Sequence, residues 1–130
     1  MGDSLDFSFS GLKTSVIRYV QGGHEGVSIE DLAASFQQAV VDVLVDHTFR
    51  AVREKSVKQV LLAGGVAANS RLQSATASTG AELGIAVGAP PSVLCTDNAA
   101  MVAAAAFFDY RRGVRTGLDM DCFASEPAIG

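Results

Sequence analysis

The chain has 130 residues and a net charge of -4, and 48% of its residues are hydrophobic. This length suits a single domain, residues 1–130, that can bury a core of its own. The acidic balance excludes the global positive field of a nucleic-acid-binding domain, and the longest apolar run, residues 99–108, is shorter than the roughly 20 residues of a membrane span.

The first half of the chain is predicted to be helical. Residues 6–14 lead through Gly11 into a short helix, and a glycine-rich loop follows over residues 21–26. Ser28 and Asp31 have the spacing of a capping box, which predicts one long helix over residues 29–55. The predicted buried stripe of this helix is Leu32, Phe36, Val40, Val43, Leu44, His47, Ala51 and Val52.

The second half alternates strands and helices, which indicates the α/β class with a few mainly parallel strands. The predicted elements are a strand over residues 57–63, a helix over 67–83, a strand over 85–87 and a helix over 97–112. Thr96 is the predicted N-cap of the last helix, and Gly113 is the residue that ends it. Residues 114–130 show little periodicity and are predicted to form an extended tail.

The N-terminal residues lack the basic and apolar regions of a secretory signal, so we expect a cytoplasmic protein. The two cysteines, Cys95 and Cys122, lack CxxC spacing, and we expect reduced thiols. The apolar fraction of this chain exceeds that of an average soluble domain, and only 18% of its residues are charged. Part of the surface is therefore expected to meet another domain or subunit.

The connection at Gly64 and Gly65 is the first candidate binding site. Two adjacent glycines remove the side chains where the backbone turns, so a flat ligand can approach the peptide groups. The same pair also suits an ordinary tight turn, because the spacing is neither a Rossmann nor a Walker fingerprint. Asn69 can present its amide to a ribose hydroxyl or a base edge, or it can cap the next helix.

Asp97 and Lys13 are the other two candidates. Asp97 is predicted in the first turn of the last helix, where a carboxylate either complements the helix dipole or binds a hard cation. If the two strands pair in parallel, both strand-to-helix connections lie at one end of the sheet. Lys13 can meet a phosphate as a point charge, or it can remain a solvated lysine.

Histidine and serine chemistry finds little support in the sequence. His24 and His47 have no partner at helical spacing, and His47 is expected to be a hydrogen-bonded interface residue. No serine lies in the G-x-S-x-G pattern of a nucleophile elbow. The residue patterns alone therefore predict a binding module with two strand-to-helix connections.

Four motifs, taken together, closely resemble the TsaD family, which is also called Gcp or glycoprotease. They are FSFSGLKT at residues 7–14, DLAASFQ at 31–37, AGGVAAN at 63–69 followed by Arg71 and Leu72, and CTDNAAM at 95–101. The resemblance is to the C-terminal part of the family. It implies one lobe of an actin-like, sugar-kinase-like (ASKHA) ATPase fold, in which two ribonuclease-H-like lobes hold a nucleotide and a metal in the cleft between them.

The resemblance also implies an activity and roles for the candidate residues. The family transfers a threonylcarbamoyl group from its adenylate to a tRNA adenosine next to the anticodon. Gly64, Gly65 and Asn69 match the family's adenosine and ribose motif, and Asp97 matches its carboxylate metal ligand, for iron, zinc or magnesium. Lys13 belongs to a family motif near the cleft.

The family's histidine ligands and phosphate-binding hairpins belong to the N-terminal lobe and have no match in these residues. The resemblance therefore implies one wall of the cleft, with no transfer activity and no tightly bound metal or adenylate in this chain alone. It implies an N-terminal lobe, TsaB-like and TsaE-like proteins and tRNA as partners, and no membrane.

Two other functions stay open. One is a metalloprotease, as the family's historical name, O-sialoglycoprotein endopeptidase, states. The other is a non-catalytic nucleotide-binding or interaction module that associates with itself through an exposed lobe interface.

Overall fold

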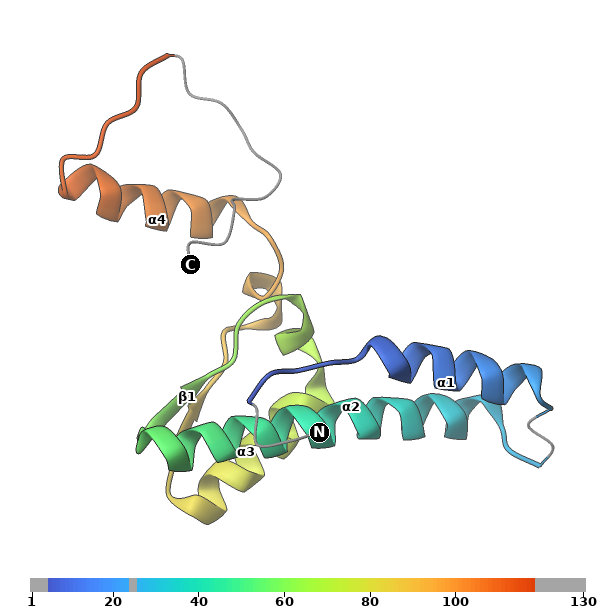
Figure 1. Ribbon diagram of the computed structural model, residues 1–130. Helices are drawn as coiled ribbons and strands as arrows, with labels where there is room; N and C mark the ends of the chain where they lie inside the picture. The colour runs from blue at the N-terminus through green and yellow to red at the C-terminus, as the bar shows by residue number, and fades with distance from the viewer. Residues whose placement is uncertain (1–4, 24–25, 119–130) are drawn as a thin grey trace. The chain divides into compact units, whose positions relative to one another are not determined.

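The computed structural model describes residues 5–23 and 26–118 (Figure 1). The chain divides into two compact units, Met1–Thr96 and Asp97–Gly130, which we describe separately. In the described ranges no helix is long and apolar enough to cross a membrane. Residues 114–118 of the predicted tail form neither helix nor strand, and the rest of it, residues 119–130, lies outside the described residues.

The first unit begins with two helices, α1 (Ser10–Gln21) and α2 (Ile29–Lys55), and Figure 1 shows α1 alongside the N-terminal half of α2. The predicted bounds of the long helix are confirmed. The Ser28 hydroxyl accepts a hydrogen bond from the Asp31 N–H at 3.0 Å and donates one to the Asp31 carboxylate at 2.8 Å. Ser56, in the left-handed conformation with φ of 51°, ends the helix.

The parallel pairing of the two predicted strands is confirmed. β1 (Gln59–Leu61) pairs with β2 (Ala86–Gly88), with Gln59 opposite Ala86 and Leu61 opposite Gly88. Both strands start later than predicted, because the preceding residues complete the ends of helices. The Val57 N–H donates to the Val52 carbonyl of α2 at 3.2 Å, and the Ile85 N–H donates to the Gly80 carbonyl of α3 (Ser70–Leu83) at 2.8 Å.

The core of the first unit lies where α3 packs against α2 and β2. Its buried residues are Val41, Phe49, Val52, Ala67, Leu72, Thr76 and Cys95. The Thr76 hydroxyl donates to the Leu72 carbonyl at 2.8 Å, which satisfies this buried polar group. At Gly80 the backbone of α3 approaches β2 so closely that an added Cβ would lie 2.4 Å from Val87 Cγ2. Gly80 lies near the C-terminal end of α3, so this close approach holds that end of the helix against β2.

The second unit contains one helix, α4 (Ala99–Arg111), within its described residues. The prediction of Thr96 as its N-cap is wrong, because Asn98 takes that position: its Oδ1 accepts from the Met101 N–H at 3.0 Å. Asn is at least as good a cap as Thr, and Asn98 has the extended backbone that a cap requires. Asp97 therefore precedes the helix instead of lying in its first turn. Gly113, with φ of +84°, ends the helix as predicted.

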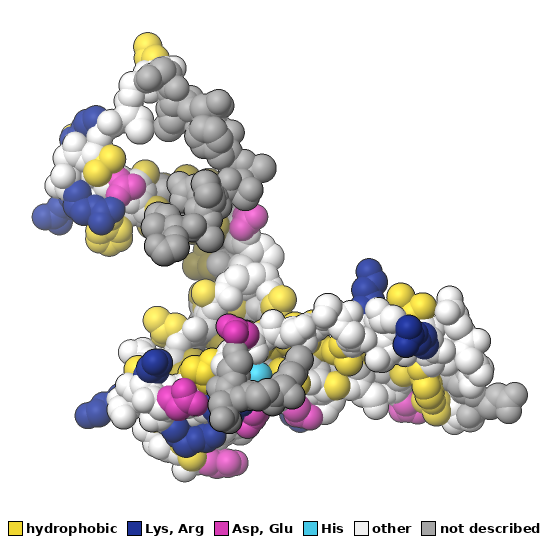
Figure 2. All heavy atoms as spheres, viewed as in Figure 1, with side chains coloured by type: hydrophobic (Ala, Val, Ile, Leu, Met, Phe, Trp, Pro, Cys, Tyr) yellow, Lys and Arg dark blue, Asp and Glu magenta, His cyan; other side chains and the backbone are white. Residues whose placement is uncertain are grey.

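Large apolar side chains remain on the surface of both units, and Figure 2 shows them among the charged residues. Leu61 of β1 is 71% exposed and Phe108 of α4 is 64% exposed. α4 has no buried residue among those of its helix. Such a surface is of the kind that another domain or protein covers.

Candidate functional site

The connection between β1 and α3, residues 64–69, forms a tight turn that we call the glycine turn. Gly64 has φ of 87° and ψ of 169°, a backbone conformation that is essentially restricted to glycine. A 3₁₀ turn, η1 (Gly65–Ala68), follows, in which the Ala67 N–H donates to the Gly64 carbonyl at 2.9 Å. Asn69 then begins α3. The tight turn thus uses a positive φ at Gly64, whereas Gly65 has none.

The space around the two glycines distinguishes them from a packing glycine such as Gly80. A Cβ added at Gly64 or at Gly65 would meet no atom of the described residues within 4 Å. Both residues are exposed, so the turn presents bare backbone to its surroundings. The requirement for a tight turn explains Gly64 through its φ, but neither φ nor packing explains Gly65. An approaching flat ligand would explain both glycines.

Asn69 joins the glycine turn to α2 through its side-chain amide. Its Oδ1 accepts from the Leu72 N–H at 3.0 Å, so it caps α3, which is one of the two roles that the sequence left open. Its Nδ2 donates to Gln37 Oε1 of α2 at 2.9 Å. An amide has two acceptor lone pairs and two donor hydrogens, so each end keeps one site for a ligand.

A groove with a volume of about 260 Å³ lies beside Asn69, between α2 and the glycine turn. Its apolar walls are Phe36, Val40, Val41, Leu44, Val66 and Leu72, and its polar groups are the amides of Gln37 and Asn69. Apolar walls with a few polar groups are typical of sites for small molecules. The volume is close to the lower limit of such sites, about 300 Å³.

Lys13 lies on a different groove. It is exposed on α1 and lines a space of about 300 Å³ between α1 and α2. The other residues that line this groove are all apolar, for example Ile17 and Leu32. Among the described residues that line this groove, no second cation and no hydroxyl stands beside Lys13 to enclose a phosphate.

The two predicted connections leave the same end of the sheet, because β1 and β2 run parallel. The 3₁₀ turn that follows β2, η2 (Ser92–Leu94), contacts η1 of the glycine turn. Asp97 is exposed and begins the second unit. Among the described residues no group of three or more His, Cys, Asp and Glu side chains is placed to hold a metal ion. Within this part of the chain, Asp97 is a single carboxylate and not a complete metal site.

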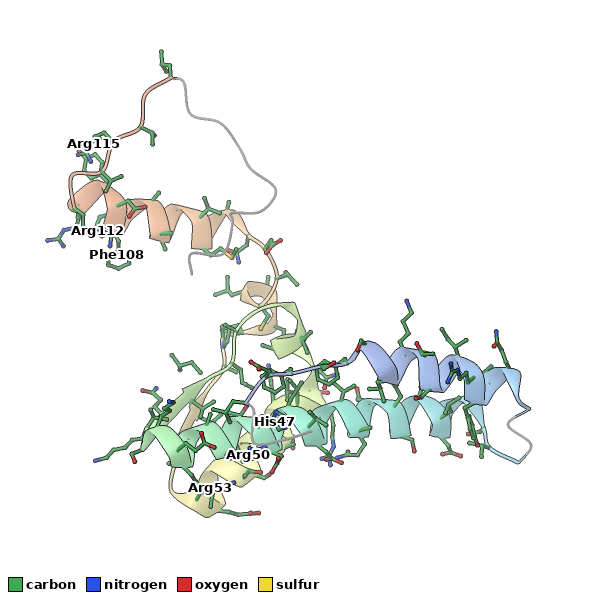
Figure 3. The ribbon with its side chains drawn as sticks, in the orientation of Figure 1. His47, Arg50, Arg53, Phe108, Arg112 and Arg115 are labelled. Atoms are coloured by element: carbon green, nitrogen blue, oxygen red, sulfur yellow. The ribbon has the colours of Figure 1, made fainter. Side chains whose placement is uncertain are left out.

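His47, labelled in Figure 3, is a residue of α2 whose hydrogen bonding differs from the prediction. Its Nδ1 is buried and has no hydrogen-bond partner among the described residues, so within this part of the chain the expectation of a hydrogen-bonded residue is wrong for this atom. The Phe7 ring lies 5.3 Å from the His47 ring, and the apolar side chains of Val57 and Val60 line the same pocket. Cys95 is a free, buried thiol, while His24 and Cys122 lie outside the described residues.

The residue patterns in the sequence did not predict that Gln37 contacts the candidate site through Asn69. It lies 32 positions before Asn69, and no local spacing predicts a contact across that separation. The available signal was its place as the last residue of the motif at residues 31–37.

Comparison with known proteins identifies the family. Residues 1–104 match the model of the family TsaD, described as tRNA N6-adenosine threonylcarbamoyltransferase. The chain is 54% identical over 127 residues to the tRNA N6-adenosine threonylcarbamoyltransferase of Symbiobacterium thermophilum, which covers 96% of this chain and 36% of that protein. The corresponding protein of Clostridium botulinum is 49% identical over 122 residues, covering 92% of this chain and 36% of the relative.

A third relative with the same name, from Dehalococcoides mccartyi, is 52% identical over 118 residues, which cover 91% of this chain and 35% of the relative. The chain thus spans about 36% of the length of the curated relatives that it matches. The matched residues include the glycine turn, Lys13 and Asp97. The chain belongs to the TsaD family.

Proposed function

We propose that this chain is the adenosine-binding part of a tRNA N6-adenosine threonylcarbamoyltransferase and forms the C-terminal lobe of an ASKHA ATPase fold. Family membership and the helix-rich structure with parallel strands support this proposal. In the complete enzyme, the N6 amine of a tRNA adenosine bonds to the carbonyl carbon of the threonylcarbamoyl group. The bond from that carbon to the phosphate oxygen breaks, AMP leaves, and the amine nitrogen loses one proton.

The observation that carries the proposal is the open backbone of the glycine turn beside the Asn69 amide. A nucleoside has a flat ring and a sugar with hydroxyl groups. The groove beside Asn69 offers apolar walls to the ring, and Asn69 keeps one donor and one acceptor for the ribose. The absence of side chains at Gly64 and Gly65 lets the ligand approach the backbone.

We propose Asp97 as one ligand of a divalent cation, either iron, zinc or magnesium, in the complete enzyme. A carboxylate oxygen suits each of these ions, but a protein site usually needs several ligands. The described residues do not supply such a set, so the remaining ligands must come from elsewhere in the enzyme. We propose that Lys13, a single positive charge on α1, takes part in binding the nucleotide or the substrate in the complete enzyme.

The proposed partners are the N-terminal lobe of the family, TsaB-like and TsaE-like proteins, and tRNA, and the proposed compartment is the cytoplasm. The exposed apolar side chains favour a second candidate function, an interaction module that associates with itself. Light scattering on the chain in solution tests whether it associates with itself. A monomer at all concentrations would contradict self-association.

Transfer of the threonylcarbamoyl group to tRNA tests the proposed function. The assay uses this chain alone, and then this chain joined to the N-terminal lobe of a family member. We expect no transfer by the chain alone and transfer by the joined protein. Asn69→Asp keeps the oxygen that caps α3 but removes the NH₂ donor, so we expect it to reduce transfer while the helix remains formed. Transfer by the chain alone, or full activity of Asn69→Asp, would contradict the proposal.

A further inference from the structure

We infer that Gln37 is a positioning residue of the adenosine site, which fixes the orientation of the Asn69 amide. This inference rests on the proposed function, because it assumes that Asn69 contacts the ligand. Gln37 belongs to α2 and Asn69 to the start of α3, and these two helices pack against each other. The hydrogen bond from Asn69 Nδ2 to Gln37 Oε1, at 2.9 Å, therefore joins two elements of the core.

The two hydrogen bonds of the Asn69 amide define its orientation completely. The Leu72 N–H requires an acceptor, which is Oδ1, and Gln37 Oε1 requires a donor, which is Nδ2. A flipped amide would place donor against donor and acceptor against acceptor. With the Leu72 bond alone, the amide plane could still rotate about the bonded oxygen. The contact with Gln37 removes this freedom, so the remaining donor and acceptor are held in place before a ligand arrives.

The adjacent glutamine provides a natural comparison. Gln38 Oε1 accepts from Arg71 Nε at 2.8 Å, and its Nε2 donates to the Asp42 carboxylate. Adjacent positions on a helix point about 100° apart, which is why the two glutamines have different partners. Gln38 thus links α2 to α3, as Gln37 does, but it makes no hydrogen bond to Asn69 in the described contacts. It is a matched control for any general effect on helix packing.

The test measures adenosine affinity by NMR titration of the chain, with adenosine as a probe because it carries no charge. Gln37→Leu removes the acceptor, and we expect it to weaken adenosine binding by about three- to five-fold, the usual contribution of one hydrogen bond. Gln37→Glu keeps an acceptor oxygen and should restore the affinity. Gln38→Leu should bind adenosine like the unmodified chain. The Asn69 side-chain NH₂ resonances should shift in Gln37→Leu and not in Gln38→Leu.

The outcomes separate this inference from the proposed function. If Gln37→Leu binds adenosine normally while Asn69→Asp does not, the positioning role is wrong and the proposed function stands. Equal losses in Gln37→Leu and Gln38→Leu would also overturn the positioning role, since they would reflect helix packing. If the unmodified chain does not bind adenosine, the proposal that the glycine turn and Asn69 bind adenosine is wrong, and the role of Gln37 is wrong with it.

Discussion

Alanine substitutions at Gly64 and Gly65 should separate the folding role of the glycine turn from its binding role. Gly64→Ala forces a side chain onto a backbone with φ of 87° and ψ of 169°. Such a conformation costs about 1–3 kcal/mol for a residue other than glycine. No atom in the described part of the chain lies within 4 Å of the added Cβ, so no steric clash with these residues adds to this cost. We therefore expect the free energy of unfolding to fall by about 1–3 kcal/mol.

Gly65→Ala should have the opposite profile. Gly65 has no positive φ, and its added Cβ also meets no atom within 4 Å, so the free energy of unfolding should change by less than about 0.5 kcal/mol. The methyl group would, however, stand on the open backbone where the adenosine is proposed to lie. We expect adenosine binding to weaken by about ten-fold, since one poorly placed group costs on the order of 1–2 kcal/mol.

Urea denaturation followed by circular dichroism measures the stability of both variants, and NMR titration measures their adenosine binding. Equal loss of stability in the two variants would refute the conformational argument for Gly64. Normal adenosine binding by Gly65→Ala would refute the argument that its missing side chain serves a ligand.

Three further substitutions test the packing and the helix caps. Gly80→Ala should lower the free energy of unfolding, measured in urea, by about 1–3 kcal/mol, because its Cβ would lie 2.4 Å from a side-chain carbon of β2. Gly11→Ala is the control, since its Cβ would meet no described atom within 4 Å, and equal effects of the two substitutions would disprove the close approach at Gly80. Asn98→Ala should reduce the helical circular dichroism signal of α4, because it removes a cap worth about 1 kcal/mol. Asn98→Asp should preserve this signal, and an unchanged signal in Asn98→Ala would reject Asn98 as the cap. Phe49→Ala should cost about 3–5 kcal/mol in the same urea assay, since Phe49 is 2% exposed, and a cost as small as that of Phe107→Ala, at 54% exposure, would contradict the assigned core.

Local signals in the sequence predicted the elements well. Ser28 and Asp31 mark the start of α2 because a cap is a contact between residues three positions apart. The start of α4 was harder, because Thr96 and Asn98 are both capable caps. The backbone conformation decided between them, because Asn98 has the extended conformation that a cap requires. As a consequence, Asp97 precedes α4 instead of lying in its predicted first turn.

Long-range packing was less predictable. The helical period correctly placed Val52 in the core, but Phe36 and Val43 of the same predicted stripe are 39% and 36% exposed. Val41 and Phe49 are buried instead, because the position of α3 determines which part of α2 is covered. A periodic pattern predicts which face of a helix is apolar, but it does not predict how much of that face a neighbouring helix covers.

The candidate site divides in the same way. The sequence predicted the glycine turn from adjacent residues, and the structure shows its open backbone. The bond between Gln37 and Asn69 was not predictable from spacing, because the fold brings the two residues together. Within the described residues, His47 Nδ1 lacks a hydrogen-bond partner, and the apolar side chains that line its pocket, such as Phe7 and Val60, come from distant positions in the chain.

The binding role of the glycine turn is tested most directly by mapping adenosine on the isotopically labelled chain by NMR. We predict that the backbone amides of residues 64–69 and the side-chain amides of Gln37 and Asn69 shift as adenosine is added, with weak affinity because the chain supplies one wall. Shifts confined to other residues, or no shifts at saturating adenosine, would contradict the assignment of this turn to the adenosine side of the site.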